Sequence, residues 1–256
     1  MSLPPQPPPP SVHKTLPKSF SDFIFSLFNP KPTSTYNHHN RFSKFPAAPI
    51  NHHHFATPQS LSDWLRPRLP SDSFAAWGSK PGTKNIHNLW LEIYEGETSL
   101  ADSTPPVRTL EVVVVRIRDH QNRILIESHQ ELSNGVVRDR SRPLSEKMKP
   151  GETVEEAVLR AVKEELGSIL REDDVTVEIV PDSYSSRVEE KVSVSYPGLP
   201  GCYILHTLDA RVNGLPDSEF CTEEDQSGEV LDESEEAVLC KRHYWKWVDS
   251  YNTVSS

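Results

Sequence analysis

The sequence predicts one domain of mixed α/β fold behind an N-terminal tail. Several segments have the apolar patterns of β-strands, and one long segment, residues 153–170, has the apolar spacing of an α-helix. The composition of residues 1–62 sets the tail apart from the domain. With 256 residues, of which 35% are hydrophobic, the chain is long enough for one core of ordinary size but not for a multidomain assembly.

Residues 1–62 have the composition of an organelle transit peptide. They hold 12 of the 23 prolines, with five basic residues and one acidic residue. A leader rich in Ser and Pro favours the plastid type over the Arg-rich mitochondrial type. We therefore predict a disordered tail that directs the protein to the chloroplast, with the mitochondrion as second choice. The alternative is a disordered Pro-rich leader without a targeting role.

The rest of the chain is acidic. The net charge of the whole chain is −10, and because the tail contributes 5 − 1 = +4, residues 63–256 carry 22 − 36 = −14. This charge argues against nucleic acid or an anionic membrane as the main partner. No apolar run approaches the roughly 20 residues that cross a bilayer, so we expect a soluble protein without a membrane partner.

Strand patterns recur through the acidic part. They cover residues 88–94, 107–117, 123–127, 175–180, 187–196, 202–212 and 238–248. The run Val107–Ile117 contains four consecutive valines, which predicts a strand buried on both faces. The turn Asp119–Asn122 then predicts that residues 123–127 pair with it. In the last segment Trp245 and Trp247 share a face, so we expect both in the core.

The predicted helix has a start signal and an acidic residue on its apolar side. Thr153 can cap the helix together with Glu156, and Gly167 lies near its end. On a helical projection Glu165 falls within the apolar arc, about 20° from Val158. A carboxylate on a buried face needs compensation, so we infer that it faces a cation or an arginine, namely Arg160. The alternative is that the helix frays and Glu165 reaches solvent.

The segment around this helix resembles the Nudix box, G-x5-E-x7-R-E-U-x-E-E-x-G-U, in which U is an aliphatic residue. The residues that match the motif or the loop leading into it are Gly151, Glu152, Arg160, Val162, Glu164, Glu165 and Gly167. On this basis the chain is identified as a member of the Nudix hydrolase family with a degenerate box. The resemblance implies an α/β/α sandwich around a mixed β-sheet, with the helix bordering the site.

The resemblance also divides the chain. It covers about residues 105–250, which become the Nudix-like domain, and it leaves residues 251–256 as a C-terminal tail. Residues 63–104 are then an N-terminal extension, foreign to the family, that packs Trp90 and its neighbours on the core.

The resemblance further implies a divalent-cation site. In the family the loop and helix hold Mg²⁺ or Mn²⁺ on the diphosphate of the substrate, and water attacks phosphorus. Here the implied metal ligands are Glu164 and Glu165, and Arg160 joins them in the implied catalytic set. Such cations need several oxygen ligands, which glutamates on one helix face can provide. Gly151, Glu152 and Gly167 take structural positions of the motif.

Two departures from the motif affect this chemistry. Ala161 stands where the family has the glutamate after the arginine, which removes one of three carboxylates. Glu146 stands at the opening glycine, where it either disturbs a close turn or returns a carboxylate to the site. The acidic segment 217–236 is first interpreted as a solvated mobile loop. As an alternative, its Glu223 or Glu224 could supply a further carboxylate to the cation site.

Two functions remain open on the sequence alone. One is a metal-dependent pyrophosphohydrolase with an altered site, acting on a small diphosphate-containing molecule such as a nucleotide-linked metabolite. The other is a catalytically inactive Nudix-like domain that serves as a binding or assembly module in an organelle. The sequence does not identify the substrate, because specificity in this fold depends on loops that share no common motif. The lone His206 on a predicted strand is more typical of a core histidine than of a base.

Overall fold

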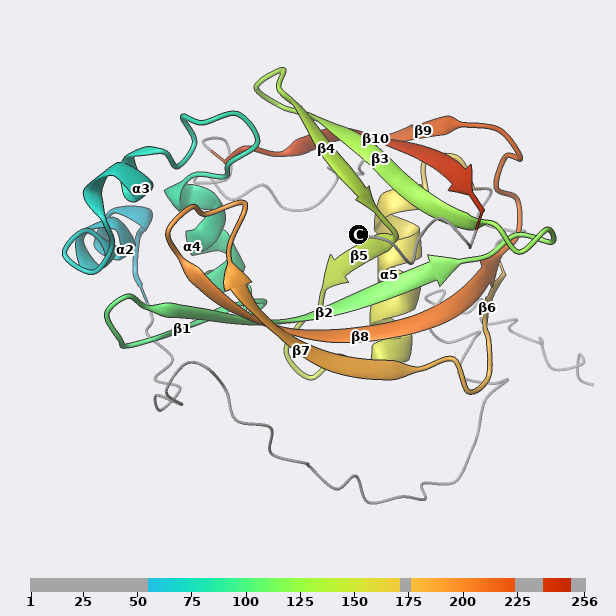
Figure 1. Ribbon diagram of the computed structural model, residues 1–256, viewed down its shortest axis with the longest axis horizontal. Coiled ribbons are helices and arrows are strands. Elements are labelled where there is room, and N and C mark those ends of the chain that lie inside the picture. Colours follow the sequence, from blue (N-terminus) through green and yellow to red (C-terminus); the bar gives the residue numbers. More distant parts are fainter. Residues whose placement is uncertain (1–54, 171–175, 224–236, 250–256) are drawn as a thin grey trace, which may run out of the picture. The chain divides into compact units, whose positions relative to one another are not determined.

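The structure is a computed structural model, and it describes residues 55–170, 176–223 and 237–249 (Figure 1). Residues 1–54 of the predicted targeting tail, the predicted C-terminal tail and residues 224–236 of the acidic segment lie outside these ranges. The described part opens with three short helices, α2 (Pro58–Leu65), α3 (Ser71–Ala75) and α4 (Ile86–Tyr94). Helix α2 therefore begins before the boundary predicted at residue 62. No described helix has the length and apolar character that a membrane span requires.

Helix α4 corrects the strand predicted at residues 88–94. Asn85 caps the helix, because its side chain accepts from Asn88 N while the Asn88 side chain accepts from Asn85 N. The helix buries Leu89 and Glu92, which are three residues apart and so lie on one helical face. A short apolar run is compatible with either a buried helix or a strand. Here the capping hydrogen bonds between Asn85 and Asn88 stabilise the helix.

The described strands form two sheets. The six-stranded sheet has the order β1-β2-β8-β6, with β5 paired to β2 and β7 paired to β8, and the four-stranded sheet has the order β4-β3-β10-β9. The bounds are β1 Ser99–Ala101, β2 Val107–Ile117, β3 Ile124–Leu132, β4 Val137–Arg142, β5 Leu144–Lys147, β6 Val177–Ile179, β7 Ser185–Val192, β8 Pro200–Val212, β9 Phe220–Glu223 and β10 Cys240–Val248. Of these strands, only β2 and β8 pair in parallel, so the larger sheet is mixed.

The hairpin predicted between residues 107–117 and 123–127 is wrong. Strand β3 pairs with β4 and β10, whereas β2 pairs with β1, β5 and β8. One isolated bridge, between Arg118 and Ile124, marks the point where the chain passes from one sheet to the other. A short turn allows a hairpin but does not force one. Here both edges of β2 are already hydrogen-bonded to other strands, namely β8 on one edge and β1 and β5 on the other.

Helix α5 (Val154–Leu166) packs against strands of both sheets (Figure 1). Its apolar face shares a core with the centre of β2 and with Trp245, which confirms that Trp245 is a core residue. Trp247 packs against the same cluster but stays partly exposed. The mixed α/β fold with a mixed sheet is thus confirmed.

The N-terminal extension has a core of its own. Residues of α2, α4 and β1 bury their apolar side chains together with Tyr196 and Leu199, which belong to the segment between β7 and β8. Trp90 is buried in this cluster, and its Nε1 donates a hydrogen bond to Phe55 O over 2.9 Å. Strand β1 also lengthens the larger sheet through its antiparallel pairing with β2.

A buried group of charges joins the extension to the domain. The Glu92 carboxylate lies 2.5 Å from Arg108 Nη2 on β2 and 3.1 Å from Lys84 Nζ. Lys147, the last residue of β5, forms an ion pair with Glu97. Since Lys147 directly precedes the loop that leads into α5, the extension anchors one end of that loop.

Candidate functional site

The loop and helix of the predicted motif form as the sequence indicates. Thr153 caps α5, because its hydroxyl accepts from Glu156 N while the Glu156 carboxylate accepts from Thr153 N. Gly151 has φ +76°, a backbone conformation that side chains other than glycine rarely adopt. Gly167 is the C-cap of the helix.

Arg160 ties the loop to the helix. Its Nε and Nη2 donate to the two carboxylate oxygens of Glu152 at 2.7 and 2.9 Å, and its Nη2 also donates to Lys147 O at 2.6 Å. Its Nη1 donates to Glu164 Oε2 at 2.8 Å. The hydrogen bond from Arg160 holds the pKa of Glu152 below its usual range. Arg160 therefore has a positioning role in the structure.

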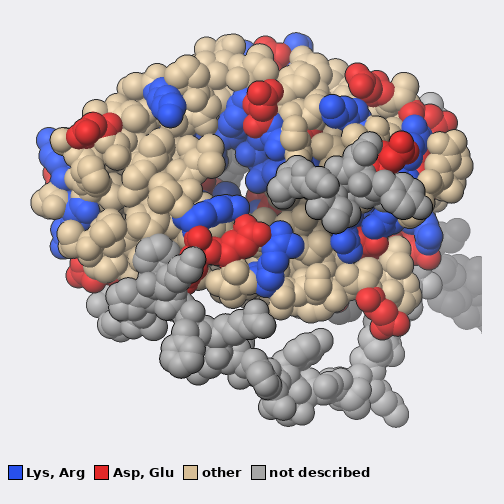
Figure 2. Space-filling view, viewed as in Figure 1, with Lys and Arg blue, Asp and Glu red and all other residues tan. Residues whose placement is uncertain are grey.

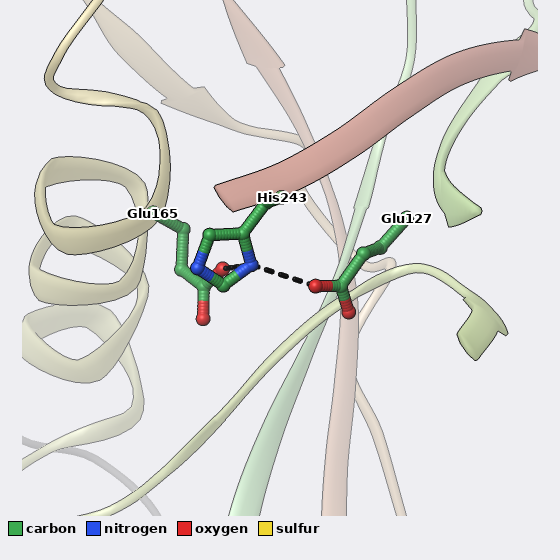
Figure 3. Close-up of side chains that lie close together, drawn as sticks. All are labelled: Glu127, Glu165 and His243. Carbon is green, nitrogen blue, oxygen red and sulfur yellow. Dashed lines mark hydrogen bonds and ion pairs between the residues drawn. The ribbon is translucent and has the colours of Figure 1, made fainter. Parts of the chain in front are cut away.

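Glu165 lies in a buried group with His243 of β10 and Glu127 of β3 (Figure 3). His243 Nδ1 donates to Glu127 Oε1 over 2.7 Å and lies equally close to Glu165 Oε2. Because Nδ1 carries one hydrogen, Glu165 Oε2 is left without a hydrogen bond from the described residues, although it lies within ion-pair distance of the imidazole. His243 Nε2 is likewise buried without a partner there. We call these three side chains the acid–histidine cluster.

Burial and charge act against each other in the acid–histidine cluster. Desolvation raises the pKa of Glu165 to about 7, even though His243 stabilises its charged form. For Glu127 desolvation is outweighed by His243 and Arg140, which lower its pKa. Desolvation also disfavours the charged form of His243, but its hydrogen bonds and the two carboxylates raise its pKa above the usual range. With one imidazolium beside two carboxylates, the cluster can take up further positive charge, either a proton or a cation.

The structure corrects one inference about Glu165. Burial of the side chain is as predicted, but the arginine offered as its partner, Arg160, is bound to Glu152 and Glu164 instead. The partner is His243. Glu164, the other predicted ligand, has a side chain that is 41% exposed and does not join the acid–histidine cluster.

The two departures from the motif have clear structural positions. Ala161 is fully buried within the core cluster that lines α5. Glu146 lies in β5, paired with Val113, so no close turn is disturbed at this position. Its carboxylate accepts from Lys147 N and lies 3.9 Å from Arg160 Nη1. Glu146 thus returns a carboxylate to the loop, where it faces the arginine.

Other candidates lie away from the acid–histidine cluster. Glu223 is exposed and pairs with Arg242 at 3.2 Å, and Glu224 lies outside the described residues. His206 has both ring nitrogens engaged, Nδ1 with Tyr184 Oη at 3.0 Å and Nε2 with Glu111 at 3.1 Å. This pairing agrees with a satisfied histidine.

Sequence reasoning missed Glu127 and His243. His243 lies two residues before Trp245, so the alternation of β10 already placed it on the core-facing side of the strand. Glu127 follows three apolar residues of a buried strand. An ionisable residue at a buried strand position is unusual, and this feature of the sequence indicates that both residues are candidates for a functional site.

Comparison with known protein families agrees with this fold. The model of the NUDIX domain family matches residues 107–247, which is more than half of the chain. A solved structure described as a NUDIX hydrolase from Nitrosomonas europaea is similar over 53% of this chain and 70% of its own, with 16% identity and a TM-score of 0.30. No curated protein sequence matches the chain.

Proposed function

The chain belongs to the NUDIX domain family, and from this premise we propose that it hydrolyses a diphosphate linkage in a small molecule with the aid of a divalent cation. The observation that carries the proposal is the buried Glu165 Oε2 on the motif helix. It has no hydrogen-bond partner among the described residues and lies beside two further ionisable side chains. A buried carboxylate oxygen in this state fits a cation.

Glu165 is the residue best placed to hold the cation. Both oxygens of Glu127 are engaged, one by His243 and the other by Arg140 at 3.1 Å, so Glu127 orients its neighbours. If the His243 imidazolium loses a proton and contributes that nitrogen, the site favours Mn²⁺ over Mg²⁺, which prefers oxygen ligands. When bound, the cation would neutralise diphosphate charge and lower the pKa of a water molecule.

The remaining motif residues support this site. Arg160 fixes the distance between the loop and the helix through Glu152 and the Lys147 carbonyl. Glu164, whose side chain is 41% exposed, would offer a second carboxylate from the solvent side of the helix. Together these residues would hold the loop in place while the substrate enters and leaves.

The test is hydrolysis by the full-length chain of a panel of dinucleoside diphosphates and sugar nucleotides, with Mg²⁺ and with Mn²⁺. We expect metal-dependent phosphate or nucleotide release from at least one compound. Glu165→Gln should lower the rate by at least about 10- to 100-fold, because this is the loss when a group that only supports a metal ligand is removed. The matched control Glu155→Gln changes an exposed glutamate of the same helix and should leave the rate unchanged.

One observation favours a second candidate, a binding module without catalysis. Ala161 is buried in the core, so the helix face is one carboxylate short of the family pattern, and His243 already compensates Glu165. On this alternative the chain binds the diphosphate compound and releases it unchanged. Absence of hydrolysis across the panel, together with retained ligand binding, would select it.

A further inference from the structure

A pocket of about 270 Å³ lies where the extension meets the domain. Residues 80–83 of the extension form one wall, residues 137–140 of β4 form another, and the segment 194–197 contributes Val194, Ser195 and Pro197. On the face drawn in Figure 2, Lys and Arg side chains gather beside a hollow near its centre. Three basic residues and one acidic residue, Asp139, line the pocket, and in a chain of net charge −10 this excess of positive charge favours an anionic ligand.

Two of the three basic residues that line the pocket, Arg138 and Lys80, form no ion pair with a described residue, whereas Arg140 is paired with Glu127. Arg138 donates from Nε and Nη2 to a single neutral acceptor, Gln130 Oε1. Among the described residues, neither Arg138 nor Lys80 has a carboxylate within ion-pair distance. Desolvation and the nearby Arg140 lower the pKa of Arg138, so an anion that entered would relieve this repulsion. Arginine is the side chain best suited to phosphate.

The wall from the extension is held firmly. Lys84 N donates to Ser195 O at 2.9 Å, and Trp77 Nε1 donates to Pro197 O at 2.9 Å. Gly82 has φ +80°, and a Cβ at this position would lie 3.6 Å from the Arg138 side chain. The chain of the extension thus passes directly beside Arg138, which fixes Lys80 at the same pocket.

The pocket also adjoins the acid–histidine cluster. Arg140, in the wall of the pocket, donates to Glu127 Oε2, and Gln130 lies between Arg138 and His243, with its Nε2 3.3 Å from His243 Nδ1. Two apolar side chains at the pocket, Val137 and Val194, are 61% and 81% exposed. A ligand that carries both an anionic group and an apolar group would cover them.

We propose that this pocket, completed by the N-terminal extension, binds the phosphate part of a diphosphate ligand through Arg138 and Lys80. The identity of the ligand as a diphosphate compound rests on the proposed function, whereas anion binding by the pocket does not. The extension is then part of the binding site as well as a support for the loop before α5.

The experiment measures the affinity of the full-length chain for inorganic pyrophosphate by calorimetry, with a chelator present so that no metal takes part. We expect Lys80→Gln and Arg138→Gln each to weaken binding by about tenfold, the loss of one charge-assisted contact. Lys80 is exposed, so we expect Lys80→Gln to fold normally. This variant therefore still tests the pocket if Arg138→Gln fails to fold. The control is Arg187→Gln, which removes one positive charge from an exposed residue of β7 and should leave pyrophosphate binding unchanged.

The outcomes separate this inference from the proposed function. Pyrophosphate binding that depends on Lys80 supports the pocket even if no compound is hydrolysed, in which case only the hydrolase proposal fails. Absence of pyrophosphate binding, or equal weakening by Arg187→Gln, would overturn the pocket. So would hydrolysis with a KM that neither Lys80→Gln nor Arg138→Gln changes, and that result would leave the hydrolase proposal standing.

Discussion

Ala161 and Ala157 lie one turn apart on α5, and both side chains are fully buried in the same core. This makes them a matched pair of positions at which to introduce a charge. A glutamate at either position places a carboxylate in the core, and we expect each variant to lose about 2–4 kcal/mol of unfolding free energy. Residue 161 is one turn from Glu165, whereas residue 157 is two turns away.

Mn²⁺ should therefore distinguish the two variants. In Ala161→Glu the new carboxylate can complete the set of helix ligands, so Mn²⁺ should restore much of the lost stability and raise hydrolysis. In Ala157→Glu it should not. Urea denaturation with and without Mn²⁺ measures this. Equal losses that Mn²⁺ leaves unchanged in both variants would mean that position 161 is simply core.

How far single side chains could be predicted depends on the distance of their partners in the sequence. The burial of Glu165 followed from helical spacing, because all the information lies within one helix. Its partners His243 and Glu127 come from two strands that are far from α5 in the sequence, and only their pairing in one sheet brings them to the helix. Local spacing suggested Arg160 instead, which is on the same helix but is occupied by the loop.

Among the elements, the attachment of α4 depends on charge. The pKa of Glu92 lies below its usual range although burial alone would raise it, because Arg108, Lys84 and Lys147 surround the carboxylate. A lowered pKa contributes stability above the pKa of the unfolded chain, about 4.3, and this contribution is lost as the pH falls toward the folded value. The attachment should therefore weaken in acid.

Glu92→Gln tests this attachment. At pH 7 we expect a loss of about 3–5 kcal/mol, because Arg108 and Lys84 keep their charges in the interior without a partner. The difference from the natural protein should shrink as the pH falls below about 4. Urea denaturation over a pH series measures it, with Glu155→Gln as the control. A difference that stays constant with pH would show that packing, not charge, holds α4.

Most elements of the domain could be predicted, but their arrangement could not. The strand at 107–117 and the helix after Thr153 have strong local signals, namely a continuous apolar run and a capping box. Helix α4 was mistaken for a strand because its apolar residues are too few to show a period. The division into two sheets depends on long-range pairing of β2 with β8, which no local pattern contains.

For the chain as a whole, we expect the extension and the tail to have separate roles. The extension completes a pocket and anchors a loop, whereas residues 1–62 are predicted to direct the protein to an organelle. A fluorescent protein fused behind residues 1–62 should enter chloroplasts, or mitochondria as second choice, because the signal is local and compositional. A fusion of residues 63–104 is the control and should stay diffuse. Diffuse fluorescence with residues 1–62 would contradict the targeting role.

Metal binding at Glu165 is the point on which the proposed chemistry depends. The most direct measurement is calorimetric titration of Mn²⁺ into the full-length chain and into Glu165→Gln and Glu164→Gln. We expect the natural protein to bind Mn²⁺, Glu165→Gln to bind it at least about tenfold more weakly, and Glu164→Gln to show the smaller loss. Unchanged affinity in Glu165→Gln, or no binding by the natural protein, would contradict a cation site at the acid–histidine cluster.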